Sequence, residues 1–368
     1  MNLTRRQFVG GAVAAALRAS ATAPSFPIYR CAGTHRELGR QHGEQAKDRI
    51  RGHAEFLRAG YKGSREAFHR AALRFLPLFD QHCPHLTEEI RGLGEGAGIP
   101  FAEAMATNIR GEITRAPAEG CTAYAVRRKG TASGGILVGQ NSDLPGKMLE
   151  FAYVLHLKPP GKPEVLIWTF GGMIGYHGMN SVGVAHFANA LGGGPAGRFA
   201  LPHYPVKRLM LECRRMSEVV ALLERVPLAS NGNYVLADGE GEILNVEATT
   251  EGLQFVRDEG KGYLAHTNHY LSAPYAKQEN FERSWPDSFP RLTRMNALLA
   301  EGMGRLDVRM LQQHLSDHSN GSRSICRHPD AKDDNQTVAS IIAEPGRRIH
   351  VAAGPPCRGR YVAYELEG

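Results

Sequence analysis

The pattern of the chain changes within residues 118–126, which read AEGCTAYAV. Before this stretch, from about residue 35 to 108, apolar residues recur at the spacing of helices. After it, short runs rich in β-branched and aromatic residues alternate with glycine-containing turns, which is typical of strands. Three helices are also predicted in this later part, over residues 201–226, 289–300 and 307–315. The order predicts an α+β fold, with one domain over residues 24–368 in which helices cover both outer faces of stacked, mostly antiparallel sheets.

A glycine-rich segment at residues 92–98, GLGEGAG, superficially resembles a dinucleotide-binding loop. It follows a predicted helix rather than a strand, and Ile99-Pro100-Phe101 then begins another helix with proline near its start. We therefore interpret the segment as a connection between two helices. No cofactor is predicted for the chain.

The composition is that of a folded protein with a sizeable core. Of the 368 residues, 42% are hydrophobic and 22% are charged, which excludes a disordered, collagen-like or disulfide-dense chain. The sequence has no run of about 18 apolar residues, so no membrane-spanning helix is predicted beyond the N-terminus. Six cysteines are scattered over the whole length, and we expect most of them to be free thiols.

The N-terminus is typical of an export signal. Arg5 and Arg6 precede a weakly apolar stretch, and ATA at residues 21–23 stands before Pro24. We interpret residues 1–23 as a twin-arginine signal peptide and predict a periplasmic or extracellular location; a frayed basic helix is the alternative. Its removal takes three Arg from the 44 Lys and Arg, which leaves 41 against 37 acids and a net charge of +4. No basic run interleaved with aromatics remains, so nucleic acid is not a predicted partner.

Gly120 and Cys121 lie where the helical pattern gives way to a strand. If the bond between them were cut, Cys121 would carry both a thiol and an α-amine. An α-amine has an ordinary pKa of about 8 and can act as a base, and a thiolate is a strong nucleophile. The same thiol can attack the Gly120 carbonyl, because glycine lets the backbone distort at low cost. For this pair alone, an inert cysteine buried in a strand is the alternative.

Eight short motifs, beginning at this cysteine, follow one another along the chain. They are CTAY (121–124), GQNSD (139–143), GMNSVGV (178–184), HTNHY (266–270), LSDH (315–318), SICRH (324–328), TVASII (337–342) and GPPC (354–357). This ordered set resembles the acyl-coenzyme A:6-aminopenicillanic acid acyltransferase (isopenicillin N acyltransferase) family of self-processing N-terminal-nucleophile hydrolases. The wider relatives are the choloylglycine and penicillin V amidases. The resemblance covers roughly nine-tenths of the chain.

The resemblance implies a four-layer αββα sandwich, which is the fold of N-terminal-nucleophile hydrolases. It implies cleavage after Gly120, which would leave a mostly helical α chain, residues 24–120, and a β chain, residues 121–368, that stay together. It also implies that Cys121 is the nucleophile and that Asp143, in the NSD motif, orients the amine and thiol of this cysteine.

The resemblance assigns roles to further polar residues. In the HTNH motif, Asn268 corresponds to the family's oxyanion-hole residue, and an amide can donate a hydrogen bond to developing negative charge. Ser142 stands where many relatives carry an aromatic residue. Four more residues are candidates for supporting roles, namely Thr249, His269, Ser324 and Arg327.

A metal site is not predicted. His266 and His269 are three residues apart on a strand or turn, so that their side chains diverge. Cys326 and His328 offer no paired C-x₂-C motif. Cys357, after Gly-Pro-Pro, is interpreted as a packing residue.

The reaction we expect is hydrolysis or acyl transfer at a non-peptide linear amide, through an acyl-cysteine intermediate. The partner would be a small amide of the acyl-amine or β-lactam-like type. Hydrolysis is favoured, because acyl-coenzyme A is a cytoplasmic donor and the chain is predicted to be exported. Two alternatives stay open: a true acyl-coenzyme A-dependent N-acyltransferase, and an exported binding protein that keeps the fold without catalysis.

Overall fold

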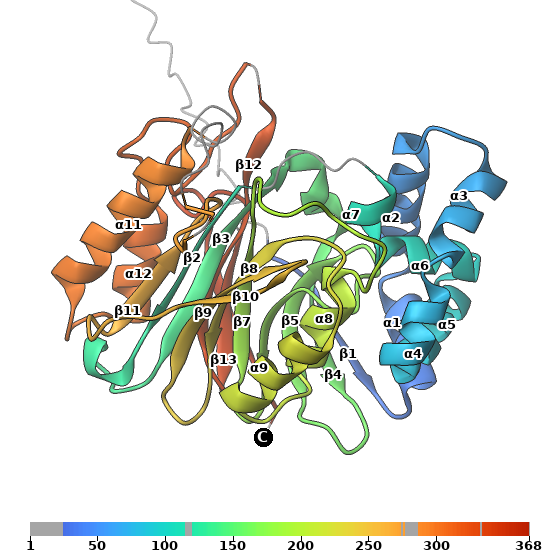
Figure 1. Cartoon of the computed structure of the whole chain (residues 1–368), viewed down its shortest axis with the longest axis horizontal. Coiled ribbons are helices and arrows are strands. Elements are labelled where there is room, and N and C mark those ends of the chain that lie inside the picture. Colours follow the sequence, from blue (N-terminus) through green and yellow to red (C-terminus); the bar gives the residue numbers. More distant parts are fainter. Residues whose placement is uncertain (1–24, 115–119, 274, 277–285, 332, 368) are drawn as a thin grey trace, which may run out of the picture.

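The computed structural model describes residues 25–114, 120–273, 275–276, 286–331 and 333–367. The predicted signal peptide therefore lies outside the described residues. In the described part, two sheets pack face to face, and helices cover the outer face of each sheet (Figure 1). The predicted αββα sandwich of mostly antiparallel sheets is confirmed.

The larger sheet has the strand order β1-β4-β5-β6-β7-β8-β9-β10 in the described residues. The strands are β1 Ile28–Ala32, β4 Ala152–Lys158, β5 Val165–Phe170, β6 His177–Asn180, β7 Ala185–Ala190, β8 Gly232–Ala237, β9 Ile243–Thr249 and β10 Gly252–Val256. Neighbouring strands run antiparallel, except that β1 is parallel to β4. Side chains alternate between the two faces: Tyr153 and Leu155 on β4 pack toward the helices, whereas Val154 packs toward the second sheet.

The smaller sheet has the order β11-β2-β3-β12-β13-β14, and all its neighbouring strands are antiparallel. The strands are β2 Gly120–Val126, β3 Leu137–Pro145, β11 Tyr263–His266, β12 Asn335–Glu344, β13 Arg348–Ala353 and β14 Tyr361–Glu365. One core cluster fills the space between the two sheets and includes the fully buried Trp168. The apolar side chains of both inner faces thus hold the sandwich together.

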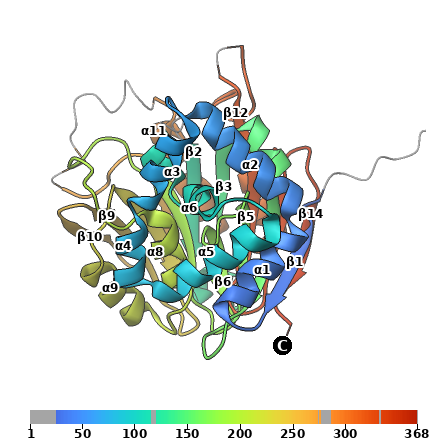
Figure 2. The same ribbon diagram turned by 90° about the vertical axis from the view of Figure 1, so that its right-hand side faces the viewer.

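Helices form the two outer layers. Those on the larger sheet are α1 His35–Gln45, α2 Lys47–Gly60, α3 Arg65–Leu73, α4 Leu76–His82, α5 Pro84–Ala97, α6 Phe101–Thr107, α7 Arg110–Ile113, α8 His203–Met210 and α9 Met216–Arg225. Figure 2 shows the first six in front of that sheet. α11 Ser288–Gly302 and α12 Val308–Leu315 cover the smaller sheet. Two short 3₁₀ helices, η1 Arg128–Gly130 and η2 Gly146–Phe151, complete the elements of the described residues.

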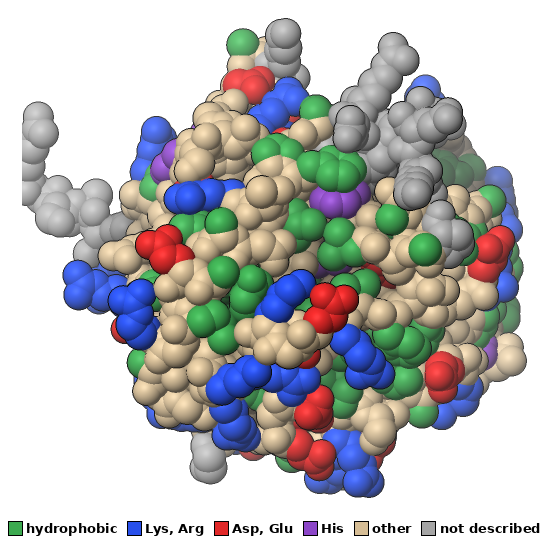
Figure 3. All heavy atoms as spheres, turned by 60° about the vertical axis from the view of Figure 1, so that its left-hand side comes forward, with side chains coloured by type: hydrophobic (Ala, Val, Ile, Leu, Met, Phe, Trp, Pro, Cys, Tyr) green, Lys and Arg blue, Asp and Glu red, His purple; other side chains and the backbone are tan. Residues whose placement is uncertain are grey.

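The surface and the helices give two further observations. On the face shown in Figure 3, basic side chains are interspersed with acidic and apolar ones. None of the helices in the described residues combines the length and the apolar character that crossing a membrane requires.

The interpretation of residues 92–98 as a connection between helices is wrong. α5 continues through this segment to Ala97, and Gly98 ends the helix with a φ of 64°. The glycines allow α1 and α5 to cross closely, because a Cβ on Gly92 would lie 2.0 Å from the carbonyl oxygen of Arg36. The glycine-rich segment that resembles a dinucleotide-binding loop therefore serves helix packing.

The single helix predicted over residues 201–226 is two helices, α8 and α9. The side chain of Asn180 binds the backbone at the break between the two helices: its Nδ2 donates to the carbonyl oxygens of Leu211 at 2.9 Å and Cys213 at 2.7 Å. The carboxylate of Asp238 accepts a hydrogen bond from the first N–H of α9 at 3.1 Å. Tertiary contacts therefore override a local pattern that favours a continuous helix.

Candidate active site

Cys121 lies on β2, between the edge strand β11 and β3. The β2–β3 register sets Gly120 opposite Asp143. On its other side, β2 pairs with β11, which ends two residues before Asn268. The sheet therefore brings three predicted site residues, far apart in sequence, to one place. Cys121 is buried, with 2% of its surface exposed.

The side chain of Asn268 holds the backbone nitrogen of Cys121. Its Oδ1 accepts a hydrogen bond from this N–H at 3.1 Å, and its Nδ2 donates to the carbonyl oxygen of Ala190 at 3.0 Å. The backbone N–H of Asn268 donates to Ser288 Oγ at 2.9 Å. The amide oxygen thus contacts the nitrogen that cleavage would turn into an α-amine, and the oxyanion role of Asn268 stays a prediction.

A buried cation that the sequence analysis did not single out, Arg291, fixes this arrangement. Its Nη1 donates to the carbonyl oxygen of Cys121 at 2.7 Å and to Thr122 Oγ1 at 3.0 Å. Its Nη2 donates to Asn268 Oδ1 at 2.8 Å. A guanidinium can only donate, so the amide must present its oxygen here. The sequence holds one signal for this role: Arg291 stands four residues before Met295, so the two residues share one face of a predicted helix. The structure shows that this face is the buried one.

Asp143, near the end of β3, lies beside Gly120. Its Oδ1 accepts a hydrogen bond from the Thr337 hydroxyl at 2.7 Å, and its buried Oδ2 has no hydrogen-bond partner among the described residues. Burial raises the pKa of the Asp143 carboxyl to about 7, while the cations of Arg291 and Arg327 oppose this rise. A carboxyl with this pKa can take up or release a proton near neutral pH.

A side chain at position 120 would crowd the site. A Cβ on Gly120 would lie 3.1 Å from Asp143 Oδ2 and 3.3 Å from Nη1 of Arg327. The guanidinium of Arg327 is itself anchored, since it donates to Asp287 Oδ2 and to Asp333 Oδ2, each at 2.6 Å. Glycine therefore lets a carboxyl and a guanidinium approach the backbone directly before the cysteine.

The thiol of Cys121 is protonated in this chain. Burial raises its pKa to about 12, the Asp143 carboxylate adds to the rise, and Arg291 opposes it. Burial also lowers the pKa of Lys207 to about 7, and the charge of Cys121 partly offsets this shift. The Nζ of Lys207 lies 3.5 Å from Nε2 of His177. Lys207, which the sequence analysis missed, is thus a second buried group near the thiol that can exchange a proton around neutral pH.

Two of the four predicted supporting residues lie at the site. Arg327 contacts it as described above, and His269 supports the loop of Asn268. Nδ1 of His269 shares a hydrogen bond of 2.8 Å with Ser288 Oγ, the group that also accepts the backbone N–H of Asn268. Its ring stacks on Phe289 with centroids 3.9 Å apart. Burial lowers the pKa of His269 to about 4, so this imidazole is neutral at neutral pH and acts as a structural support.

The structure places the other two predicted supporting residues in local roles. The Thr249 hydroxyl donates to the carbonyl oxygen of Gly252 at 2.9 Å, within the turn between β9 and β10. Ser324 Oγ accepts a hydrogen bond from the backbone N–H of Asn320 at 2.6 Å. Neither of these hydrogen bonds reaches Cys121.

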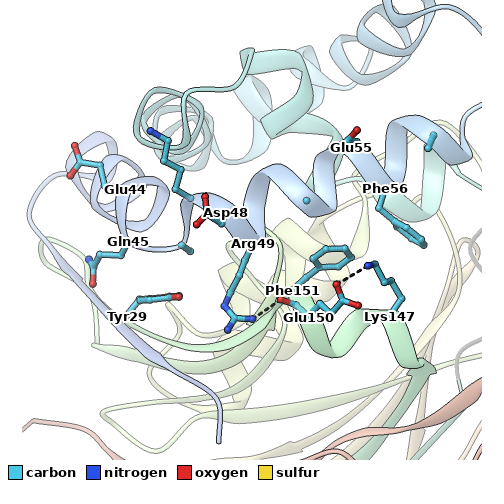
Figure 4. A pocket seen from close by; sticks show the side chains of 14 residues that line it. Tyr29, Glu44, Gln45, Asp48, Arg49, Glu55, Phe56, Lys147, Glu150 and Phe151 are labelled. Atoms are coloured by element: carbon cyan, nitrogen blue, oxygen red, sulfur yellow. Dashed lines mark hydrogen bonds and ion pairs between the residues drawn. The ribbon is translucent and has the colours of Figure 1, made fainter. Parts of the chain in front are cut away.

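An open pocket of about 950 Å³ lies elsewhere, between α2, β1 and η2 (Figure 4). Charged side chains line it together with Phe56 and Phe151, and an ion pair of 2.6 Å joins Lys147 to Glu150. None of its lining residues belongs to the group around Cys121. The pocket therefore has no part in the arrangement described above.

Comparison with known proteins identifies the family. The family model of acyl-coenzyme A:6-aminopenicillanic acid acyl-transferase matches residues 127–354. The chain belongs to this acyl-transferase family. A curated member, the acyl-coenzyme A:6-aminopenicillanic-acid-acyltransferase 40 kDa form of Emericella nidulans, is 30% identical over 340 residues, which cover 89% of this chain and 92% of that protein. Membership in the acyl-transferase family makes the chain an enzyme that acts on amides.

Several solved structures are similar to this member of the acyl-transferase family. A mutant of the conjugated bile acid hydrolase from Clostridium perfringens is 12% identical, with a TM-score of 0.42, and the match covers 67% of this chain and 97% of that one. The Caenorhabditis elegans ortholog of N-acylethanolamine-hydrolyzing acid amidase is 16% identical, with a TM-score of 0.44 and coverage of 67% and 100%. Penicillin V acylase from Agrobacterium tumefaciens is 12% identical, with a TM-score of 0.39 and coverage of 64% and 76%.

Proposed function

We propose that the chain is a self-cleaving amide hydrolase whose nucleophile is the thiol of Cys121. The observation that carries this proposal is the setting of the bond between Gly120 and Cys121. The buried Asp143 carboxyl, with a pKa of about 7, lies against Gly120, and the Asn268 amide holds the nitrogen of Cys121. Membership in a family that acts on amides supports the same chemistry.

Self-cleavage begins when the sulfur of Cys121 attacks the carbonyl carbon of Gly120. The Asp143 carboxylate accepts the thiol proton, which offsets the high pKa of the thiol, and returns it to the Cys121 nitrogen as the C–N bond breaks. This step produces a thioester of Gly120 and the α-amine of Cys121. Water then hydrolyses the thioester, which leaves a carboxylate on Gly120 and restores the thiol. Asn268 Oδ1 contacts the nitrogen from the start, so the amine forms already held.

Turnover reuses the same thiol on a substrate. The thiolate attacks the amide carbonyl, and the α-ammonium of Cys121 protonates the leaving amine of the substrate. The α-amine of Cys121 then deprotonates a water molecule, which releases the acid. Asn268 and a backbone N–H are proposed to hold the oxyanion. We propose a small, non-peptide linear amide of the acyl-amine or β-lactam-like type as substrate, which the name of the Emericella relative supports.

The proposal includes export through the twin-arginine pathway. Its support is the pair Arg5-Arg6 before a weakly apolar stretch and an A-x-A sequence. Outside the cytoplasm acyl-coenzyme A is not supplied, so hydrolysis of the acyl-cysteine is the proposed outcome rather than transfer.

The test is the intact mass of the purified wild-type chain beside Cys121→Ala. We expect two wild-type species, one with the mass of residues 121–368, and a single uncleaved species for Cys121→Ala. Turnover of linear amides is expected only in the wild type. Cys213→Ala, which removes a half-buried thiol far along the chain in the α8–α9 connection, is the matched control and should cleave as the wild type does.

Two results would contradict the proposal. A wild-type chain that turns over amides without being cleaved would exclude the N-terminal nucleophile. Turnover that survives in Cys121→Ala would exclude this thiol altogether.

A further inference from the structure

A second group of reactive side chains lies outside the active site. It comprises His318, Cys326, His328 and Cys357, which we call the Cys/His cluster. His318 follows α12, Cys326 and His328 lie in the segment before β12, and Cys357 lies in the connection from β13 to β14. One ligand atom from each residue lies within 4.8 Å of all the others. The fold thus brings three separate segments to one point.

The distances from His328 to the other three residues of the Cys/His cluster are close to those within a tetrahedral ligand shell. Nε2 of His328 lies 3.1 Å from Nε2 of His318, 3.6 Å from the sulfur of Cys326 and 3.3 Å from the sulfur of Cys357. A tetrahedral zinc ion with Zn–N bonds of about 2.05 Å and Zn–S bonds of about 2.3 Å separates its ligand atoms by about 3.3–3.8 Å. Small movements of four side chains would therefore complete such a shell.

We propose that the Cys/His cluster binds one Zn²⁺ ion. Two cysteines and two histidines are a common ligand set of structural zinc sites. On binding, each thiol loses its proton to solvent, so two thiolates balance the charge of the ion and the two imidazoles stay neutral. His318 and Cys357 are exposed, so the ion has a route from solvent, whereas Cys326 is buried and anchors the site.

The sequence alone does not predict this site, because Cys326 and His328 lie in no motif that supplies two further ligands. His318 lies ten residues away from His328, and Cys357 lies 29 residues beyond it. The antiparallel pairing of β12 with β13 returns the chain and delivers Cys357 to the other three ligands. Only the fold shows that the number and type of ligands suit zinc.

The proposed ion has a structural role beside the active site. Arg327 stands between two of the ligands, and its backbone N–H donates to Thr337 Oγ1 at 3.0 Å, the hydroxyl that binds Asp143. Zinc would fix the segment that carries Arg327 and attach it to the connection between β13 and β14. The ion itself contacts neither Cys121 nor the substrate and takes no part in the proposed chemistry.

The experiment measures metal in the full chain purified in the presence of zinc and then freed of excess metal. We expect about one Zn²⁺ per chain by inductively coupled plasma mass spectrometry. His318→Ala and Cys357→Ala should each lose most of it, and these exposed positions leave no cavity when shortened. The matched controls, His350→Ala and Cys213→Ala, should keep it. Replacement by Co²⁺ gives a second readout, since thiolate ligands in a tetrahedral shell produce intense visible absorption.

Two outcomes would overturn the proposal. One is a wild-type chain without metal whose mass is lower by two hydrogen atoms and whose peptides join Cys326 to Cys357, which would make the pair a disulfide. The other is zinc that remains bound at the same level in both His318→Ala and Cys357→Ala. Neither outcome depends on self-cleavage or turnover, so this test stands apart from the test of Cys121.

Discussion

The chain holds its thiols in two contrasting settings, at Cys121 and in the Cys/His cluster. Cys121 is buried in a strand, and an amide, a guanidinium and a carboxyl surround the bond that precedes it. Cys326 and Cys357 have imidazoles as neighbours instead, and Cys357 is exposed. Among the described residues, no group of potential metal ligands includes Cys121.

Cys121 and Cys326 are both buried, so the neighbours of the two thiols, and not their burial, distinguish the two settings. Groups that donate and exchange protons near neutral pH suit bond cleavage, because they move the proton that leaves the thiol. Several nitrogen and sulfur ligands at one point suit a metal ion, which replaces the protons of the thiols. Arg327 connects the two settings, since it lies between two cluster residues and pairs with Asp287 at the active site.

The largest effect that would separate the two settings is expected at Asn268. Asn268→Ala should lower the kcat of the cleaved enzyme about 10²–10³-fold, because it removes an oxyanion donor. Its zinc content should not change. The measurement is turnover per cleaved chain, with Asn296→Ala as the control, since this amide donates to the carbonyl oxygen of Leu292 within α11. Turnover equal to that of the wild type would remove Asn268 from the oxyanion hole.

The fold could be predicted from the sequence, because it depends on local patterns and on a family resemblance, whereas the roles of Cys121, Asp143 and Asn268 stay predictions. The change of pattern at residues 118–126 marked the start of β2, and the motifs around Asp143 and Asn268 sit at strand ends that the sheet brings together. Arg291 was missed because its contact with Cys121 spans 170 residues of sequence. Its position on the inner face of a helix was visible, but its partners were not.

The Cys/His cluster was missed for a related reason. Each of its segments is ordinary when read alone, and the ligand set exists only once β12 and β13 pair. The fold likewise decided the fate of Thr249, whose hydroxyl closes a turn. Residue types could be ranked from sequence, but which of them meet is set by tertiary packing.

The second effect concerns the stability of the unprocessed chain and is expected at Asp143. An acid whose pKa is raised on folding, here from 3.8 to about 7, stabilises the fold at low pH and loses this contribution as the pH rises. In the uncleavable Cys121→Ala background, the free energy of unfolding should fall by roughly 2 kcal/mol between about pH 5 and about pH 7 because of this group. Adding Asp143→Asn should remove that fall.

Urea unfolding at the two pH values measures this difference. Adding Asp48→Asn, at an exposed carboxylate on α2, is the control and should leave the pH dependence of the Cys121→Ala chain unchanged. A pH dependence that is the same with and without Asp143 would show that this carboxyl is not forced to ionise in the interior.

The smallest effect is expected at Arg327, where the two settings meet. Its cation opposes the rise in the pKa of Asp143, so Arg327→Gln should raise the midpoint of the pH dependence of self-cleavage by about one unit. The sign follows because cleavage needs the carboxylate of Asp143 to accept the thiol proton.

The midpoint is measured by unfolding the chain, returning it to folding conditions, and following the rate of cleavage from about pH 5 to about pH 9. Arg323→Gln, at a half-buried arginine of the same segment, should leave it unchanged. Zinc content should stay at the wild-type level, because Arg327 supplies no ligand atom, so a shifted midpoint with metal retained separates a charge effect from collapse of the Cys/His cluster. An unshifted midpoint would mean that Asp143 does not control the proton of Cys121.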